Sequence, residues 1–247
     1  MNRRAVALFG AVGLFPLTVV AAPAAQADPG ERTYRVTIVN LTSGQAFTPV
    51  VAATHNRRTD VFEVGAPASV GVQQIAENGN VTPLVDALST DTDVSDLVVG
   101  QAPLVPEARV GPTGFPNATT FTITADHRAD RLSYVAMLIC TNDGFSGLDG
   151  VRLPVKKDRP ETFLTNGYDA GTEINTEKFA DIVPPCQGLI GAISPNGTSG
   201  TGTTNPALAE GSVITHHPNV VGTDDGLDPA VHGWEDPVLQ VTVTRTS

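Results

Sequence analysis

The sequence predicts a mainly β protein, an antiparallel β-sandwich with a short helical insert and long loops. Several segments alternate apolar and polar residues with a period of two, which is typical of half-buried strands. The 24 glycines and 19 prolines are scattered along the 247 residues, as expected of many short strands joined by turns. One stretch shows helical spacing instead.

Five segments are predicted to be strands. Three alternate strictly: "TYRVTIVN", "TTFTITAD" and "PVLQVTVTR". In the first of them Tyr34, Val36 and Ile38 share one face. Two denser apolar runs, "FTPVVAATH" and "LSYVAMLIC", are typical of strands that lie deeper in a sheet pair. Because the first and last strands are of the same half-buried type, we expect the two ends of the chain to meet in one sheet.

The helical insert is predicted in "SVGVQQIAENG". Ser69 is a candidate N-cap, and Gly79 after an asparagine is a stop signal. Between them Val72, Ile75 and Ala76 recur at helical spacing. The following "VTPLVDALS" is compatible with a second short helix, and "TDTDVSD" with an acidic loop.

The first 27 residues predict a secretory signal peptide. Arg3 and Arg4 precede an apolar run over residues 5–20, and the Ala-Gln-Ala at 25–27 supplies a small-x-small cleavage pattern, so the mature chain is expected to begin at Asp28. The apolar run is too short and wrongly flanked for a membrane anchor, and no later stretch is long enough to span. We therefore expect a secreted, extracellular protein without membrane insertion.

The net charge argues against nucleic acid as a partner. Removing the signal takes away two arginines and no acidic residue, so the formal charge of −11 becomes −13. Nucleic acids and anionic membranes need clustered Lys and Arg, which this chain lacks. Residues 28–247 are expected to form a single monomeric domain, within which residues 194–206, rich in Gly, Ser, Thr and Asn, predict a mobile surface loop.

The two cysteines, Cys140 and Cys186, both belong to the exported part of the chain. In an oxidising compartment a single disulfide is the expected state, with two buried free thiols as the alternative. A bridge would close a loop of about 45 residues and stabilise the fold by roughly 3–4 kcal/mol in the chain-entropy model. The spacing of the two cysteines excludes both a CxxC redox pair and a thiolate zinc site.

Carboxylates on two loops predict a metal site. "CTNDGFSGLDG" carries Asp143 and Asp149, and "YDAGTEIN" carries Asp169 and Glu173. We expect Asp143, Asp169 and Glu173 to converge at one end of the sandwich, with Gly171 letting the second loop turn inward and Asp149 outside the ligand set. Hard oxygen ligands from loops are those that Ca²⁺ takes. Acidic loops that are merely hydrated are the alternative.

These segments together resemble the spondin domain, a module of secreted matrix proteins and of bacterial secreted proteins. The resemblance starts at "YRVTIVNLTSGQAFTPVVAATH", continues through "VGAPASVGVQQIAENG", "LSYVAMLICTNDGFSGLDGV" and "YDAGTEIN", and ends at "VLQVTVTR". It covers nearly all of the chain after the signal, and the order and spacing of the segments agree. The resemblance implies a C2-like eight-stranded antiparallel β-sandwich with one calcium ion at one end.

The resemblance also assigns the ligands. In animal spondin domains an Asp in a Pro-Asp-Trp turn and both acids of Trp-Asp-Ala-Gly-Thr-Asp hold the ion. Asp143 matches the first position, within Asn-Asp-Gly, and Asp169 and Glu173 match the other two. Tyr168 stands in place of the Trp, and Glu173 in place of the second Asp. Because Glu reaches one methylene further, Glu173 can still bind while its loop lies differently.

Other chemistry has weaker support. His216 and His217 could form a transition-metal site with His55, but adjacent residues on a strand point to opposite faces. No G-x-S-x-G, P-loop, HExxH or GxGxxG motif is present. A secreted glycosidase-like hydrolase using the loop carboxylates is the alternative, although the chain is only 5% aromatic. We expect no enzyme but a calcium-binding adhesion or surface module, whose partner is an unknown protein or glycan.

Overall fold

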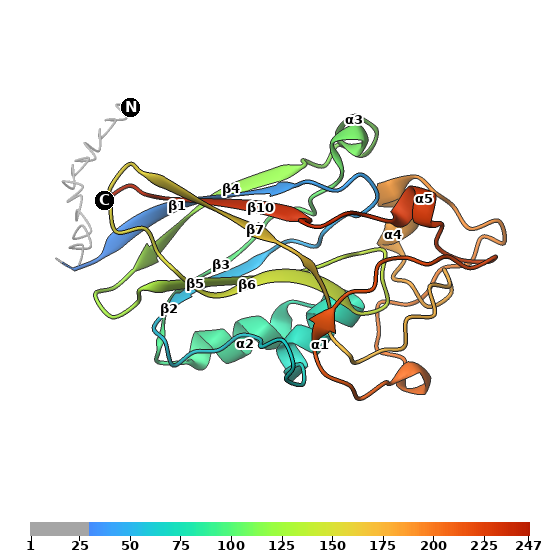
Figure 1. Ribbon diagram of the computed structural model, residues 1–247, viewed down its shortest axis with the longest axis horizontal. Helices are drawn as coiled ribbons and strands as arrows, with labels where there is room; N and C mark the ends of the chain where they lie inside the picture. Colours follow the sequence, from blue (N-terminus) through green and yellow to red (C-terminus); the bar gives the residue numbers. More distant parts are fainter. Residues whose placement is uncertain (1–29) are drawn as a thin grey trace, which may run out of the picture.

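Two antiparallel sheets pack face to face, and long connections gather at one end of the molecule (Figure 1). The computed structural model describes residues 30–247, so the predicted signal peptide over residues 1–27 lies outside the described part of the chain. The predicted antiparallel sandwich with a helical insert is confirmed.

The first sheet contains both ends of the described chain. Its order is β4-β1-β10-β7. The strands are β1 (Arg32–Asn40), β4 (Ala118–Ala125), β7 (Pro160–Thr165) and β10 (Leu239–Arg245). β1 pairs with β10 along its length, with Val36 opposite Val243 and Ile38 opposite Val241. The prediction that the first and last strands meet in one sheet is therefore confirmed.

The second sheet is larger, with the order β3-β2-β5-β6-β8-β9. The strands are β2 (Val51–His55), β3 (Val94–Val99), β5 (Arg131–Met137), β6 (Gly144–Arg152), β8 (Gly167–Asp169) and β9 (Thr215–His216). Residues 30–247 thus form ten strands, where the family resemblance implied eight. β8 and β9 are short strands of three and two residues, which extend the sheet beyond β6.

Helices α1 (Val70–Asn78) and α2 (Thr82–Thr90) form the helical insert and cover the outer face of the second sheet (Figure 1). The Ser69 side chain accepts a hydrogen bond from the N–H of Val72, and Gly79 ends α1 with a φ of 66°, so both predicted end signals are confirmed. The other helical segments lie in connections: η1 (Glu107–Arg109), α3 (Val110–Thr113), α4 (Pro185–Ile190), η2 (Pro206–Leu208) and α5 (Pro229–His232). None of the helices within residues 30–247 is long and apolar enough to cross a membrane.

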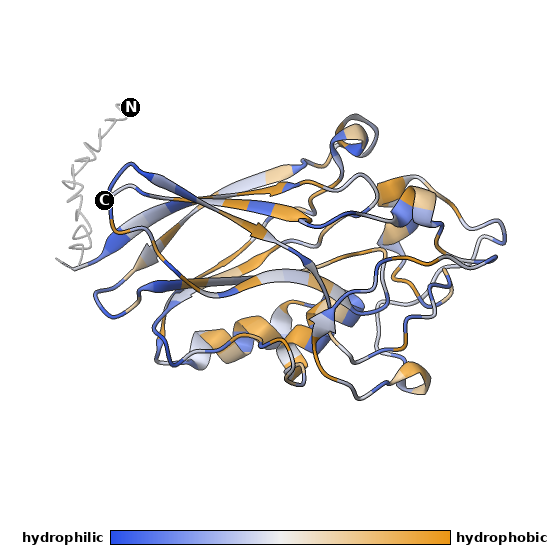
Figure 2. Cartoon of the chain, viewed as in Figure 1, coloured by the Kyte–Doolittle hydropathy of each residue, from blue (hydrophilic) through white to orange (hydrophobic). Residues whose placement is uncertain are grey.

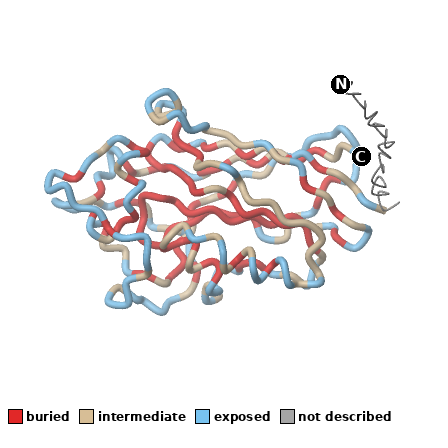
Figure 3. Tube along the Cα trace, turned by 180° about the vertical axis from the view of Figure 1, so that it is seen from behind, coloured by how far each residue is buried: buried red, intermediate tan, exposed pale blue. Residues whose placement is uncertain are grey.

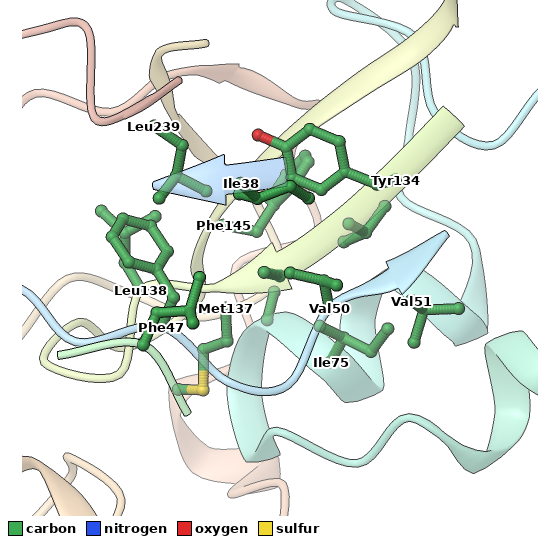
Figure 4. Packing of buried hydrophobic residues seen from close by; sticks show 14 of the residues in the cluster. Ile38, Phe47, Val50, Val51, Ile75, Tyr134, Met137, Leu138, Phe145 and Leu239 are labelled. Carbon is green, nitrogen blue, oxygen red and sulfur yellow. The ribbon is translucent and has the colours of Figure 1, made fainter. Parts of the chain in front are cut away.

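The core fills the space between the two sheets and continues under α1. Apolar residues recur along the strands of both sheets and in α1 and α2 (Figure 2), and the buried parts of the chain run along the central strands (Figure 3). In Figure 4 Ile38 of β1 and Leu239 of β10 approach Tyr134 of β5, whereas Ile75 comes from α1. Six of the seven residues of β5 are buried because one face meets the first sheet and the other meets α1. This explains why its sequence is densely apolar rather than strictly alternating.

The segment over residues 194–206, which was predicted to be a mobile surface loop, is exposed for most of its length and is held at several points. The N–H of Gly200 donates to the carbonyl of Ile182, and Ser194 is buried. At the far end Thr204 Oγ1 donates to the buried Glu77 carboxylate of α1 and accepts from Gln74. This loop lacks large apolar side chains, and hydrogen bonds of its hydroxyl groups anchor it instead. The amino-acid composition does not reveal these bonds.

We predict that Thr204→Val destabilises the protein by about 1–3 kcal/mol, because the buried Glu77 carboxylate would lose a donor. Urea unfolding of the oxidised protein measures this change. Thr203→Val is the matched control, since Thr203 is exposed and its hydroxyl bonds only within the loop, to Thr201. It should change the free energy of unfolding by no more than about 0.5 kcal/mol. Equal stability of the two variants would contradict the anchoring role.

Candidate metal centre

Pairing between β6 and β8 brings the two acidic loops together. Asp143 directly precedes β6 and Asp169 is the last residue of β8, and Gly144 lies opposite Asp169 in the register. The N–H of Ala170 also donates to the Asp143 carbonyl at 3.1 Å. Two carboxylates that are 26 positions apart in the sequence therefore become neighbours through strand pairing.

Asp143 is fully buried, and one of its oxygens is enclosed by the YDAGTEIN loop. Oδ2 accepts hydrogen bonds from the N–H of Thr172 at 2.7 Å, from its hydroxyl at 3.2 Å, and from the N–H of Glu173 at 3.0 Å. Oδ1 is equally buried but has no hydrogen-bond partner within residues 30–247. A buried carboxylate oxygen without a hydrogen-bond partner destabilises the folded state. A bound ligand at Oδ1 would remove that destabilisation.

Asp169 is also buried, with 6% of its surface exposed. Oδ1 accepts from the N–H of Gly171 at 2.7 Å, and Oδ2 accepts from the Asn175 side chain. Gly171 has a φ of 68°, and a Cβ added there would lie 2.6 Å from the carbonyl oxygen of Val213. The turn after Asp169 therefore requires glycine for both its conformation and its close approach to a neighbouring segment.

Glu173 lies near two further carboxylates, those of Glu77 and Asp181. It lines a cavity of about 250 Å³ together with Glu77 and Asp181. Burial, with the charges of Glu77, Asp143 and Asp181 in support, raises the pKa of Glu173 to about 7, even though a backbone donor at Asn205 opposes the shift. The charge that acts on Glu173 most strongly is thus that of Glu77, a residue from α1.

Within residues 30–247, Asp143, Asp169 and Glu173 form no ion pair with a basic side chain. Burial, followed by the charge of Asp169, raises the pKa of Asp143 to about 7 despite the hydrogen bonds to its Oδ2. The three ion pairs found in the described chain lie elsewhere, at Arg58, Arg128 and Arg131. Like charges buried together lower their repulsion by taking up a proton or a cation.

The three predicted ligands do not form a closed coordination set in this structure. Within residues 30–247, one group of three His, Cys, Asp or Glu side chains has ligand atoms that all lie within 4.8 Å of one another, and it is Cys140, Cys186 and His232. An ion held by Asp143, Asp169 and Glu173 together would therefore require a side-chain movement, for which the longer Glu173 is suited. Asp149 is engaged elsewhere and accepts from the N–H of Val61 and from Ser133.

The three histidines considered above as a transition-metal site make different contacts. His55 is buried between the Asn56 carbonyl and the Ser133 hydroxyl, at 2.7 Å from each. His216 stacks on Tyr168, with ring centroids 5.3 Å apart, whereas His217 packs edge-on against Trp234. The two adjacent histidines therefore contact different aromatic rings, and β9 ends at His216, so His217 lies outside the strand.

Sequence reasoning missed several residues that shape this region. Thr172 and Asn175 lie within the YDAGTEIN segment itself, and their hydrogen bonds to Asp143 and Asp169 could have been suspected from their positions. Glu77 could not, because it lies on α1, almost a hundred positions away from Glu173. Glu177 is buried as well, and its carboxylate accepts from two backbone N–H groups, those of Val221 and Gly222.

The predicted disulfide between Cys140 and Cys186 is confirmed. It joins the turn that precedes Asp143 to α4, and the two Cα atoms are 5.0 Å apart. The bridge closes a segment of 46 positions that contains both acidic loops. Movement of Asp143 is therefore restricted by a covalent bond three residues away as well as by its hydrogen bonds.

Residues 30–247 form an antiparallel β-sandwich in which strand pairing joins two acidic loops and a disulfide closes the segment that contains them. The family model Spondin_N matches residues 37–181, which is more than half of the chain, and the protein therefore belongs to the spondin domain family. The match includes Asp143, Asp169 and Glu173. Comparison with curated proteins found no match. Family membership indicates an extracellular spondin-like domain, and the disulfide is consistent with secretion.

Proposed function

We propose that this protein is a secreted, non-catalytic calcium-binding module that acts in adhesion or in interaction at a surface. The observation that carries the calcium proposal is Asp143, a fully buried carboxylate with one oxygen unpartnered in the described chain and a second buried carboxylate, Asp169, beside it. A divalent cation would satisfy that oxygen and neutralise both charges. Carboxylate oxygens are also the donors that Ca²⁺ prefers.

Asp143, Asp169 and Glu173 are the residues that would hold the ion. Asp143 would use Oδ1, since Oδ2 already accepts three hydrogen bonds from the loop. Asp169 keeps lone pairs available beside the bonds from Gly171 and Asn175. The bound ion would supply electrostatic and structural stabilisation, by joining the loop before β6 to the loop after β8.

A secreted hydrolase is the second candidate, and one observation favours it. Asp143 and Glu173 have pKa values raised to about 7, in the range expected of a general acid. Both carboxyl groups are almost completely buried, however, with 0% and 4% exposure. A substrate as large as a sugar would need open access to them, so we favour the binding module.

Calorimetric titration of the oxidised mature chain should detect one calcium ion per molecule. Asp143→Asn should weaken binding at least tenfold, because it removes a charge at the most buried position of the site while keeping the side-chain shape. Asp228→Asn is the control, since Asp228 caps α5 through its side chain and asparagine caps as well. If the wild-type chain binds no calcium, or if both variants bind it equally, the metal proposal is wrong.

A further inference from the structure

His232, the last residue of α5, lies beside the disulfide. A ring nitrogen of His232 and the sulfur atoms of Cys140 and Cys186 all lie within 4.8 Å of one another. All three residues are buried, and they come from three separate segments: the turn after β5, α4 and α5. The function proposed above uses none of them as a ligand.

One ring nitrogen of His232 contacts the backbone at Asp228. Its Nδ1 accepts a hydrogen bond from the Asp228 N–H at 3.0 Å and lies 3.2 Å from the Asp228 carbonyl oxygen. Nε2 is buried and has no hydrogen-bond partner in the part of the chain that the structure describes. With Nδ1 accepting from that N–H, the ring proton is on Nε2. Metal binding through Nε2 therefore requires the other tautomer, in which Nδ1 donates to the Asp228 carbonyl, as ligating histidines commonly do, and gives up the bond from the N–H. Burial also lowers the pKa of His232, which favours the neutral, ligating form.

We propose that the reduced protein binds a thiophilic divalent cation such as Zn²⁺ through Cys140, Cys186 and His232, and that the disulfide and the metal exclude each other. In the oxidised protein the two sulfur atoms are bonded to each other and carry no charge. Reduction adds two electrons and two protons to the S–S bond and yields two thiols. Binding of Zn²⁺ then releases both protons, and the two thiolates neutralise the ion.

The geometry accommodates this exchange with small movements. With Zn–S bonds of about 2.3 Å, tetrahedral thiolates lie roughly 3.8 Å apart, a separation that side-chain rotation can reach from Cα atoms 5.0 Å apart. His232 would be the third ligand, and solvent would take the fourth position. The resulting site is electrically neutral, so its burial carries little of the penalty that an isolated charge would have.

A cavity of about 510 Å³ leads to the histidine side of this site. His232 forms part of its wall together with Phe179, whose ring packs edge-on against the imidazole. Asp224 and Asp228 line the same cavity and would attract a cation. The spacing of the cysteines in the sequence predicts no thiolate zinc site, whereas the fold brings a ring nitrogen from α5 to the two sulfur atoms.

Cobalt spectroscopy on the mature chain tests the proposal. The chain is reduced with a phosphine, which becomes the phosphine oxide, under anaerobic conditions with excess calcium to fill the carboxylate site. Co²⁺ should then give thiolate-to-metal charge-transfer absorption and the intense visible bands of a tetrahedral site, and one equivalent of Zn²⁺ should abolish both. The oxidised chain should show neither signal.

His232→Asn should lower the Zn²⁺ affinity of the reduced chain at least tenfold, measured by competition with a chromophoric chelator. His217→Asn is the matched control, since His217 also carries a buried Nε2 that is unpartnered within residues 30–247, and it should leave the affinity unchanged. The proposal is overturned if the two variants bind Zn²⁺ equally well or if the reduced wild-type chain shows no cobalt bands. It is also overturned if circular dichroism shows that the metal-bound reduced chain is unfolded.

Discussion

Calcium is expected to stabilise the oxidised mature chain by about 2.7 kcal/mol when the free ion exceeds its dissociation constant a hundredfold. For a chain of this size the unfolding temperature should rise by roughly 5–10 °C relative to the protein in chelator. The physical reason is that unfolding would release the ion and separate Asp143 from Asp169, which β6–β8 pairing brings together. Scanning calorimetry with calcium and with chelator measures the difference.

Asp169→Asn should abolish most of this calcium-dependent shift. In chelator the same variant should be at least as stable as the wild type, because the repulsion between Asp169 and the buried Asp143 is removed. The substitution therefore separates metal binding from general damage to the fold. A wild-type unfolding temperature that is identical in calcium and in chelator would contradict the proposed site.

Loss of the disulfide is expected to have the largest effect on stability. Replacing Cys140 and Cys186 together by alanine should lower the free energy of unfolding by about 3–4 kcal/mol, since the closed loop spans 46 positions. The unfolding temperature should fall by roughly 10 °C. Urea unfolding in calcium-free buffer measures this change without a contribution from the metal.

A reductant provides the control for the disulfide prediction. It should destabilise the wild-type chain by a similar amount and leave the double alanine variant unchanged, since that variant has no thiol. Equal midpoints for the oxidised wild type and the alanine variant would show that the bridge contributes nothing to folding. The bridge would then serve only to position the turn before Asp143.

Strands and helix ends were predictable because their signals are local. The alternation in β1 places Tyr34, Val36 and Ile38 on the buried face, and each of them is at most 1% exposed. Ser69 and Gly79 bound α1 through hydrogen bonds that involve residues only three to five positions away. Five of the ten strands in the described chain were not predicted. β8 and β9 consist of three and two residues, too few for a period to appear, whereas β3 and β6 begin in segments interpreted as loops and β7 was not assigned.

The composition of the loop over residues 194–206 was a poor guide to its attachment. A segment without large apolar residues was expected to be mobile, yet Thr204 bonds to Glu77 and Gly200 packs closely against the carbonyl of Ile182. Hydrogen bonds from hydroxyl and backbone groups leave no pattern in a sequence. Their partners lie on α1 and near α4, which only the folded chain brings within reach.

The sequence alone determined the class of fold, the cysteine pair and the acids that the spondin family uses, because each depends on residue type and order. Tertiary structure decided which of these groups meet. Strand pairing places Asp143 against Asp169, whereas Glu173 lies near Glu77, and packing of α5 places His232 at the disulfide. Contacts of this kind depend on distances between segments remote in sequence, and those distances are set by the packing of the whole chain.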